Sequence, residues 1–211
     1  MDTLRRSMRH LVFAVLVACG PARPAGEPLR PHPPKPPSEE LSQALVPLDW
    51  WLGSWRADHG DGVGWNENTS ENGIVVNGDR VTAYGLFVEH FQKHQTLWNG
   101  EAGRVYFYQS ETPYDAPNQA AWQHPDGNGY ASYKLAPEVT THELWGGGVY
   151  GIFHNSVVLD NAFETPTAPG IGLHHLVTMW LGFAPGSEIS HIVNGTGDAV
   201  HDGSEQAKTS Y

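Results

Sequence analysis

The stretch that decides the fold runs Gly73-Ile-Val-Val-Asn77-Gly78-Asp79-Arg80-Val81-Thr-Ala-Tyr-Gly-Leu-Phe-Val-Glu89-His90 and resumes as Thr96-Leu-Trp98-Asn99-Gly100-Glu-Ala-Gly-Arg-Val105-Tyr-Phe-Tyr-Gln109. The pair Asn77-Gly78 recurs 22 residues later as Asn99-Gly100, and a β-rich run follows each pair. Repeats of this length are typical of solenoids, including the parallel β-helix. Asn-Gly is also the favoured turn of a two-residue hairpin, so two antiparallel hairpins fit the same pattern.

Composition favours strands and loops over helices. The 24 Gly and 16 Pro interrupt the chain too often for long helices, while Trp, Tyr, Val and Thr dominate the ordered runs. If the chain is a β-helix, residues 74–109 form parallel strands stacked coil on coil, with Val76 and Val81 pointing inward. Further strands are expected over Val139–Glu143, Gly148–Phe153, Ser156–Leu159, Leu173–Trp180 and Ile189–Val193.

A resemblance to known proteins favours the parallel β-helix over the two antiparallel hairpins. It is carried by the peptides that begin at Trp55, Val76, Tyr84, Leu97, Gln109, Asn118, Thr141, Pro169, His174 and Ser190. Between residues 55 and 200 the chain resembles the C-terminal region of secreted pectate-lyase-like proteins related to the family 55 β-1,3-glucanases, often described by an attached discoidin or carbohydrate-binding module. The resemblance implies an all-β fold, made of the C-terminal coils of a right-handed parallel β-helix plus a β-rich capping region.

The resemblance also raises a structural problem. Relatives of this type carry a long β-helix before the matching region, and here a short N-terminal segment takes its place. A bare end of a solenoid exposes unpaired strand groups and apolar coil interior. A partner chain that completes the β-helix is therefore one expectation, and a truncated gene product is another.

The N-terminal segment indicates export. Arg5, Arg6 and Arg9 precede an apolar run that is too short to span a membrane, as in a signal peptide. The peptide Leu16-Val17-Ala18-Cys19 resembles a lipobox, so we expect a signal peptide over 1–18 and a lipid on Cys19. Residues 19–44 form a Pro-rich tether, and 45–211 form the β-helix-like domain. The expected location is the bacterial cell envelope, or the extracellular space if the lipobox is not used.

Charge limits the class of partner. The formal net charge is −11, and no basic patch is available to neutralise phosphates, so nucleic acid is not an expected partner. Acidity also disfavours polyanionic substrates through like-charge repulsion, which leaves neutral polysaccharide. Cys19 is the only cysteine, so the domain has no disulfide framework.

Candidate acids and bases follow from the chemistry of glycoside hydrolysis, which needs two carboxyl groups across the scissile bond. The sequence-based choice is Asp58, Asp61 and Asp79, because the first two lie in a Gly-rich segment and the third falls one coil later. Asp and Gly also simply build turns, which is the alternative for each of them. The other carboxyl groups in the matching peptides are Glu89, Glu111, Asp115 and Glu143.

Sugar binding requires flat aromatic faces beside polar groups, and Trp65, Trp98, Glu89 and His90 are the residues chosen for it. Most Trp residues of such a domain belong to the core, which is the competing interpretation. His90 and His94 have the spacing of a helical zinc pair, but their surroundings are β-rich, so no metal and no cofactor is expected.

Two functions remain open at this point. The first is a surface-anchored, carbohydrate-active enzyme of the glycoside hydrolase type. The second is a non-catalytic glycan-binding or structural accessory module.

Overall fold

The structure, a computed structural model, describes residues 64–67 and 69–211. The expected signal peptide and tether, with Cys19, Asp58 and Asp61, lie outside these residues. Within the described part the chain forms strands, turns and loops and no helix. Accordingly, that part contains no helix that could cross a membrane.

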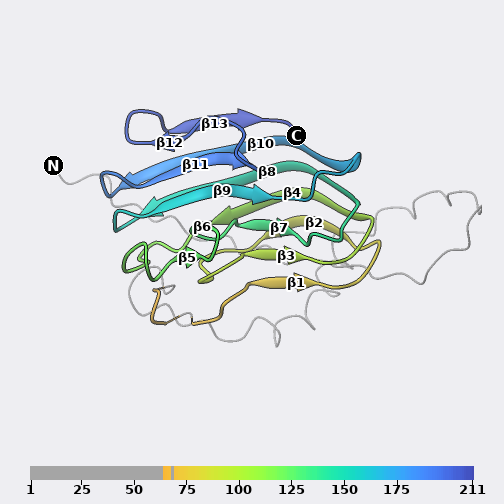
Figure 1. The fold of residues 1–211 in the computed structure, drawn as a ribbon, viewed down its shortest axis with the longest axis horizontal. Coiled ribbons are helices and arrows are strands. Elements are labelled where there is room, and N and C mark those ends of the chain that lie inside the picture. The colour runs from red at the N-terminus through yellow and green to blue at the C-terminus, as the bar shows by residue number, and fades with distance from the viewer. Residues whose placement is uncertain (1–63, 68) are drawn as a thin grey trace, which may run out of the picture.

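Two sheets make up the body of the fold (Figure 1). Sheet A has the strand order β13 (Gln206–Thr209), β10 (Gly170–Phe183), β8 (Thr141–Phe153), β4 (Gly103–Glu111) and β2 (Thr82–Phe87). Sheet B has the order β1 (Ile74–Val76), β3 (Thr96–Trp98), β7 (Tyr133–Leu135), β9 (Val158–Glu164), β11 (Glu188–Val193) and β12 (Val200–His201). A small hairpin of β5 (Gln123–His124) and β6 (Gly127–Asn128) projects from the loop before β7.

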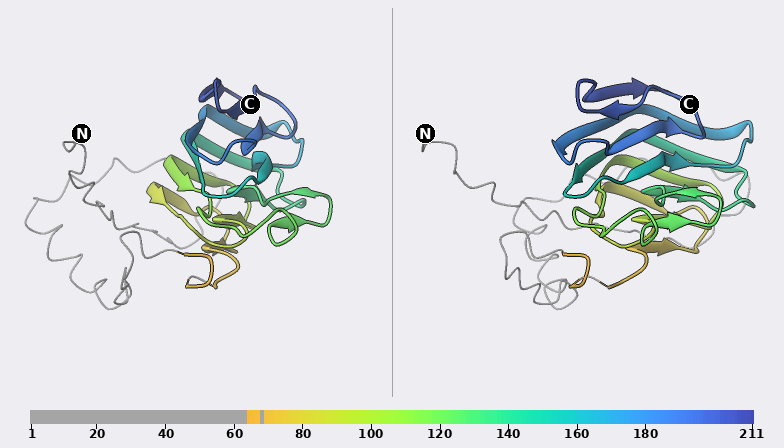
Figure 2. Two further views of the ribbon diagram at one scale, coloured as in Figure 1. Left: turned by 90° about the vertical axis from the view of Figure 1, so that its left-hand side faces the viewer. Right: turned by 60° about the vertical axis from the view of Figure 1, so that its left-hand side comes forward.

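The chain alternates between the sheets and so winds into coils. Each coil contributes one strand to sheet B and the next to sheet A, as the colour gradient of Figure 2 shows. The pairs β1–β3, β3–β7, β7–β9 and β9–β11 are parallel, as are β2–β4, β4–β8 and β8–β10. This confirms the predicted parallel β-helix and excludes the hairpin interpretation, because β2 pairs with β4 in parallel.

The repeated Asn-Gly pairs mark the coil repeat itself. The Nδ2 group of Asn99 donates to Oδ1 of Asn77 at 2.7 Å, across 22 residues of sequence. Gly100 is required here, because a Cβ at this position would come within 1.9 Å of the Gly78 carbonyl oxygen. The two turns therefore stack directly, one coil above the other, which the sequence spacing predicts.

The space between the two sheets is filled by the side chains that point inward. Val76 and Val81 are buried, as predicted, and alternate residues of β2, β4 and β8 follow them inward. Trp98, Trp122, Tyr108, Tyr133, Phe153 and Phe163 are the largest buried side chains. Burial of large aromatic rings is the main favourable term available to a domain without disulfides.

Two strands differ from the sequence-based expectation. The strand expected over Ser156–Leu159 is β9, which runs over Val158–Glu164 instead. Val139–Glu143 and Gly148–Phe153 were expected as separate strands, but both fall within β8 or next to it. A glycine stands in this strand because the interior is tightly packed there. A Cβ on Gly147 would lie 2.9 Å from the side chains of Leu144 and Leu176. Gly146, with φ of 73°, provides a left-handed residue that interrupts the ladder without shifting its register or breaking the strand.

The same left-handed residue recurs in four coils of sheet A. The skipped positions lie in register across β2, β4, β8 and β10 and all have positive φ: Gly85 (64°), Phe107 (67°), Gly146 (73°) and His175 (58°). A left-handed residue changes the phase of the in-and-out alternation, as in β4, where Tyr106 and Phe107 are both exposed. Because the four residues stack in register, the residues after this line share one surface.

Successive coils are also joined by polar contacts at the surface. The Glu101 carboxylate accepts hydrogen bonds from the hydroxyl groups of Thr141 and Thr140, at 2.6 and 3.0 Å, and from both backbone amides, at 3.0 and 2.8 Å. These donors, Thr141 first, lower the pKa of Glu101 to about 2. The ionised carboxylate therefore clamps the loop before β4 to the start of β8.

Acid should weaken this clamp. The folded-state pKa of Glu101 lies below its ordinary value of 4.5, so its contribution is present above pH 4.5 and is lost as the pH falls towards 2. We expect the melting temperature of the wild type to fall more steeply over this range than that of Glu101→Gln, measured by circular dichroism. Glu138→Gln, at an exposed site in the same loop region, is the matched control and should follow the wild type. Parallel curves for wild type and Glu101→Gln would contradict the clamp.

Candidate functional site

Two carboxylates lie at the same position of consecutive coils, at the ends of β2 and β4. Glu111 is the last residue of β4, and Glu89 follows β2 by two residues. The pairing of the two segments continues to this point, since the amides of Val88 and His90 donate to the carbonyls of Gln109 and Glu111, both at 3.2 Å. The coil repeat that aligns Asn77 with Asn99 therefore also aligns these two glutamates.

A histidine lies between the two carboxylates. His90 Nε2 is 3.6 Å from a carboxylate oxygen of Glu89 and 3.6 Å from one of Glu111. One ligand atom from each of the three residues lies within 4.8 Å of the others. His90 is buried, whereas the side chains of Glu89 and Glu111 remain 27% and 21% exposed. Both carboxylates are therefore open to a small molecule, whereas the imidazole is largely covered.

Hydrogen-bond donors hold Glu111 in place. The Tyr114 hydroxyl donates to Oε2 of Glu111, and the Gln109 amide donates to Oε1 at 3.4 Å. In the next coil Tyr150 pairs in register with Glu111, and burial, with the nearby Glu111 charge, raises the pKa of Tyr150. Tyr150 therefore stays a neutral donor beside the carboxylate.

The backbone at His90 shows that the arrangement is constrained. His90 has φ of 65°, in the left-handed region that costs a non-glycine residue free energy. Its ring packs edge-on against Tyr114, with ring centroids 4.4 Å apart. Backbone strain that the surroundings hold in place is found preferentially at functional sites.

The chemistry open to this cluster is of two kinds. Two carboxylates that a ligand can reach, one of them bonded to fixed donors, are the groups needed for proton transfer at a glycosidic bond. Glu89, His90 and Glu111 also offer three atoms that could hold a metal ion. His94 takes no part, because it is buried and its Nδ1 bonds to the Ala131 carbonyl at 2.8 Å.

The sequence-predicted residues fall in different places. Glu89 and His90 lie in the cluster. Asp79 is exposed in a turn, where its Oδ1 accepts from the Glu101 amide at 3.0 Å. Trp98 has no exposed surface, so a sugar could not stack on its ring. Trp65 is half-buried against the core, and its amide donates to Asp115 at 2.9 Å.

Glu111 is the residue that sequence reasoning considered but did not choose. The signal that would have selected it is its separation from Glu89, which equals the Asn77–Asn99 repeat. Asp58 and Asp61 lie outside the described residues, so the geometry bears only on Asp79 among the three predicted catalytic residues.

The coils, the two parallel sheets and the carboxylates at their outer surface define the class of protein: a pectate-lyase-like parallel β-helix. Comparison with known proteins agrees. Residues 41–111 match the LAM55 pectate lyase-like domain. An exo-β-1,3-glucanase of Streptomyces sp. (strain SirexAA-E / ActE) is 47% identical over 146 residues, which cover 68% of this chain and 24% of the relative.

Solved structures give the same relationship. The structure of sacteLam55A from Streptomyces sp. SirexAA-E superposes with a TM-score of 0.67 at 44% identity, over 74% of this chain and 29% of the other. A variant of that protein in complex with glucose has a TM-score of 0.68 at the same identity and coverage. The chain is therefore related to the family 55 β-1,3-glucanases, and it spans about a quarter of the length of the curated relative that it matches.

Proposed function

We propose that the chain is a carbohydrate-active protein of the glycoside hydrolase type, acting on neutral β-glucan, with Glu89 and Glu111 as its acid and base. The observation that carries the proposal is the alignment of the two carboxylates on consecutive coils, within reach of solvent and beside fixed donors. The relatives support the substrate class, since one is described as an exo-β-1,3-glucanase and another was solved with glucose.

The activity can be tested directly. The purified protein is incubated with a panel of polysaccharides, and released sugars are measured by chromatography. The proposal expects release from β-1,3-glucan and none from polygalacturonate, because the acidic protein repels a polyanion. Absence of release across the whole panel would contradict the enzymatic proposal.

A second function comes from the extent of the match. The chain spans 24% of the curated relative and 29% of the solved one, so the activity of the whole relatives is not carried over to it directly. The alternative is a non-catalytic glycan-binding or accessory module, or a subunit that pairs with a partner chain. Retention on a β-glucan column without turnover would favour this alternative, and turnover restored by a partner would identify a two-chain assembly.

The proposed location is the cell envelope, through a lipid on Cys19. The support is the peptide Leu16-Val17-Ala18-Cys19 after a basic and apolar segment. Expressed with its own N-terminus in a bacterium, the protein should partition into detergent with the membrane fraction, and Cys19→Ala should be soluble or unprocessed. Equal membrane retention of Cys19→Ala would contradict the lipid anchor.

A further inference from the structure

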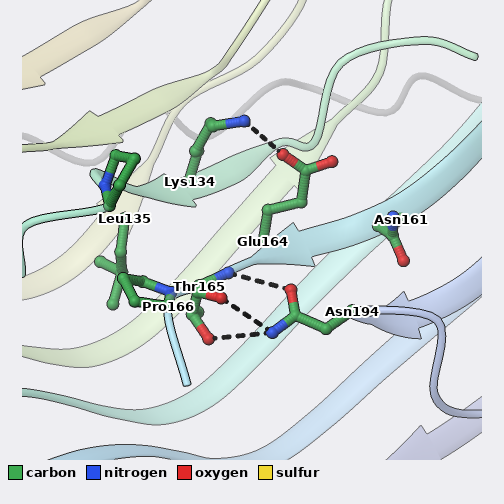
Figure 3. Close-up of a pocket in the computed structure, with 8 residues that line it drawn as sticks. Lys134, Leu135, Asn161, Glu164, Thr165, Pro166 and Asn194 are labelled. Carbon is green, nitrogen blue, oxygen red and sulfur yellow. Dashed lines mark hydrogen bonds and ion pairs between the residues drawn. The ribbon is translucent and has the colours of Figure 1, made fainter. Parts of the chain in front are cut away.

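A polar trough lies on the outer surface of sheet B. It consists of two adjoining hollows of about 400 and 220 Å³, which share Lys134, Asn161 and Glu164. The first continues past Pro137, Pro166 and Asn194, as Figure 3 shows in part. The second is bounded by the β5–β6 hairpin. The larger hollow alone has a volume usual for small-ligand sites.

The side chains of the trough are fixed by contacts with one another. Lys134 Nζ lies 2.6 Å from Oε2 of Glu164, and both side chains are partly buried. Asn194 Nδ2 donates to the Thr165 carbonyl at 2.9 Å, while the Thr165 amide donates to Asn194 Oδ1 at 3.1 Å (Figure 3). A ligand would therefore meet groups that are already ordered, which lowers the entropic cost of binding.

The far end of the trough is ordered in the same way. Both oxygens of Asp160 accept from Asn128, Oδ2 from the backbone amide at 2.8 Å and Oδ1 from the side chain at 3.1 Å. A Cβ at Gly127 would lie 2.6 Å from Asp160 Oδ2, so the hairpin approaches the carboxylate closely because this residue is glycine. The hairpin is thus held against β9 and forms a wall of the trough.

Charge and hydrogen bonding select the ligand class. Asp126, Asp160 and Glu164 outnumber Lys134 in the lining, which disfavours an anion. The attraction for a free cation is reduced, because Glu164 is paired with Lys134 and Asp160 is bonded to Asn128. A neutral molecule whose hydroxyl groups both donate and accept fits these partly satisfied carboxylates, amides and ammonium group.

We propose that this trough is a second saccharide-binding site, separate from the carboxylate pair. It lies over β7, β9 and the loop after β11, on sheet B, whereas Glu89 and Glu111 belong to the coil segments of sheet A. The proposal rests on the proposed substrate class, a neutral glucan, but not on the identity of the catalytic residues. A protein with a binding site on each sheet would hold a polysaccharide chain at two places.

Binding is measured with laminaritetraose, a neutral β-1,3-linked tetramer of glucose, by ¹H–¹⁵N NMR on the full chain. The double variant Glu89→Gln/Glu111→Gln is used so that the sugar is not consumed. We expect the amide signals of Gly127, Gly129 and Gly195 to shift, since the first two line the trough and the third donates to Asn161 at 2.7 Å. The trough is open and lacks a large aromatic platform, so a dissociation constant near 1 mM is expected, to within about tenfold.

Two charge-removing variants provide the matched comparison. Lys134→Met should weaken binding at least fivefold, because it removes a donor and leaves Glu164 unpaired. Lys93→Met removes a lysine with an equally short ion pair, 2.6 Å to Glu71, from a site outside the trough, and it should bind like the parent. Glu164→Gln keeps the size of the side chain and should also weaken binding, which guards against a folding defect in Lys134→Met.

Shifts confined to residues around Glu111 and Tyr150, or unchanged affinity in both trough variants, would overturn the proposal. Equal binding of a trigalacturonate probe would overturn the choice of a neutral ligand. Trough shifts in the double variant, together with no sugar release by the wild type, would support the second site and contradict the enzymatic proposal. Sugar release by the wild type without any trough shift would support the enzymatic proposal and contradict the second site.

Discussion

Glu111→Gln and Glu89→Gln should each lower the rate of glucan hydrolysis by about 10² to 10⁴-fold, because removal of a general acid or base typically costs that much. Glutamine has nearly the same shape as glutamate and can keep the contacts of Glu111 with Tyr114 and Gln109. The melting temperature should therefore change little. The measurement is the initial rate of sugar release from β-1,3-glucan at fixed protein concentration, compared with thermal unfolding of the same samples.

Asp79→Asn is the discriminating control for this prediction. Asp79 accepts a hydrogen bond from the Glu101 amide in an exposed turn, so its replacement should leave the rate within a few-fold of the wild type. A large loss in Asp79→Asn with normal rates in both glutamate variants would restore the sequence-based choice and remove the proposed pair. The same assay on Asp58→Asn and Asp61→Asn tests the rest of that choice.

The fold was predictable because two Asn-Gly pairs show the length of the coil repeat. Asn77-Gly78 and Asn99-Gly100 stack directly, and the hydrogen bond between the two Asn side chains requires the same phase in both coils. Later coils are longer, and the insertion that carries the β5–β6 hairpin lies between β4 and β7. The turns that follow β7 and β9 do not repeat the Asn-Gly pair at that spacing, so the resemblance to known β-helices extended the fold beyond residue 109.

The candidate site was predictable only in part, for a physical reason. Asp next to Gly is the usual marker of an exposed loop, and this directed attention to Asp58, Asp61 and Asp79. The paired glutamates instead lie at the end of β4 and two residues after β2, and coil register brings them together. The Tyr114 hydroxyl, three residues along the chain, bonds to Glu111. Trp98 shows the same limit, since its apolar bulk is needed at the centre of the coil and leaves no face for a sugar.

The interior also contains a titratable group that sequence reasoning did not single out. His142 is buried in β8, its Nε2 bonds to the Tyr133 hydroxyl at 2.8 Å, and its ring packs edge-on against Trp98. Burial lowers the pKa of His142 to about 3. The folded protein therefore holds this imidazole neutral, whereas the unfolded chain binds a proton near pH 6.5.

Mild acid should destabilise the domain through this histidine. Between pH 6.5 and 3 the unfolded state binds the extra proton, so stability falls with decreasing pH, by up to about 1.4 kcal/mol per pH unit. From pH 6.5 to 4.5 the loss should reach about 2 to 3 kcal/mol, measured by urea unfolding at each pH. His94, whose pKa burial also lowers, acts in the same direction, while the Glu101 clamp weakens only below pH 4.5.

His142→Gln separates this effect from the other titrations. Glutamine keeps a polar group for the Tyr133 hydroxyl but does not titrate, so the variant should be less stable at pH 7 and lose less stability between pH 6.5 and 4.5. His201→Gln, at an exposed site, is the matched control and should keep the slope of the wild type. If His142→Gln lost as much unfolding free energy as the wild type between pH 6.5 and 4.5, the buried imidazole would not be the group that limits stability in acid. Other titratable groups would then have to account for the loss.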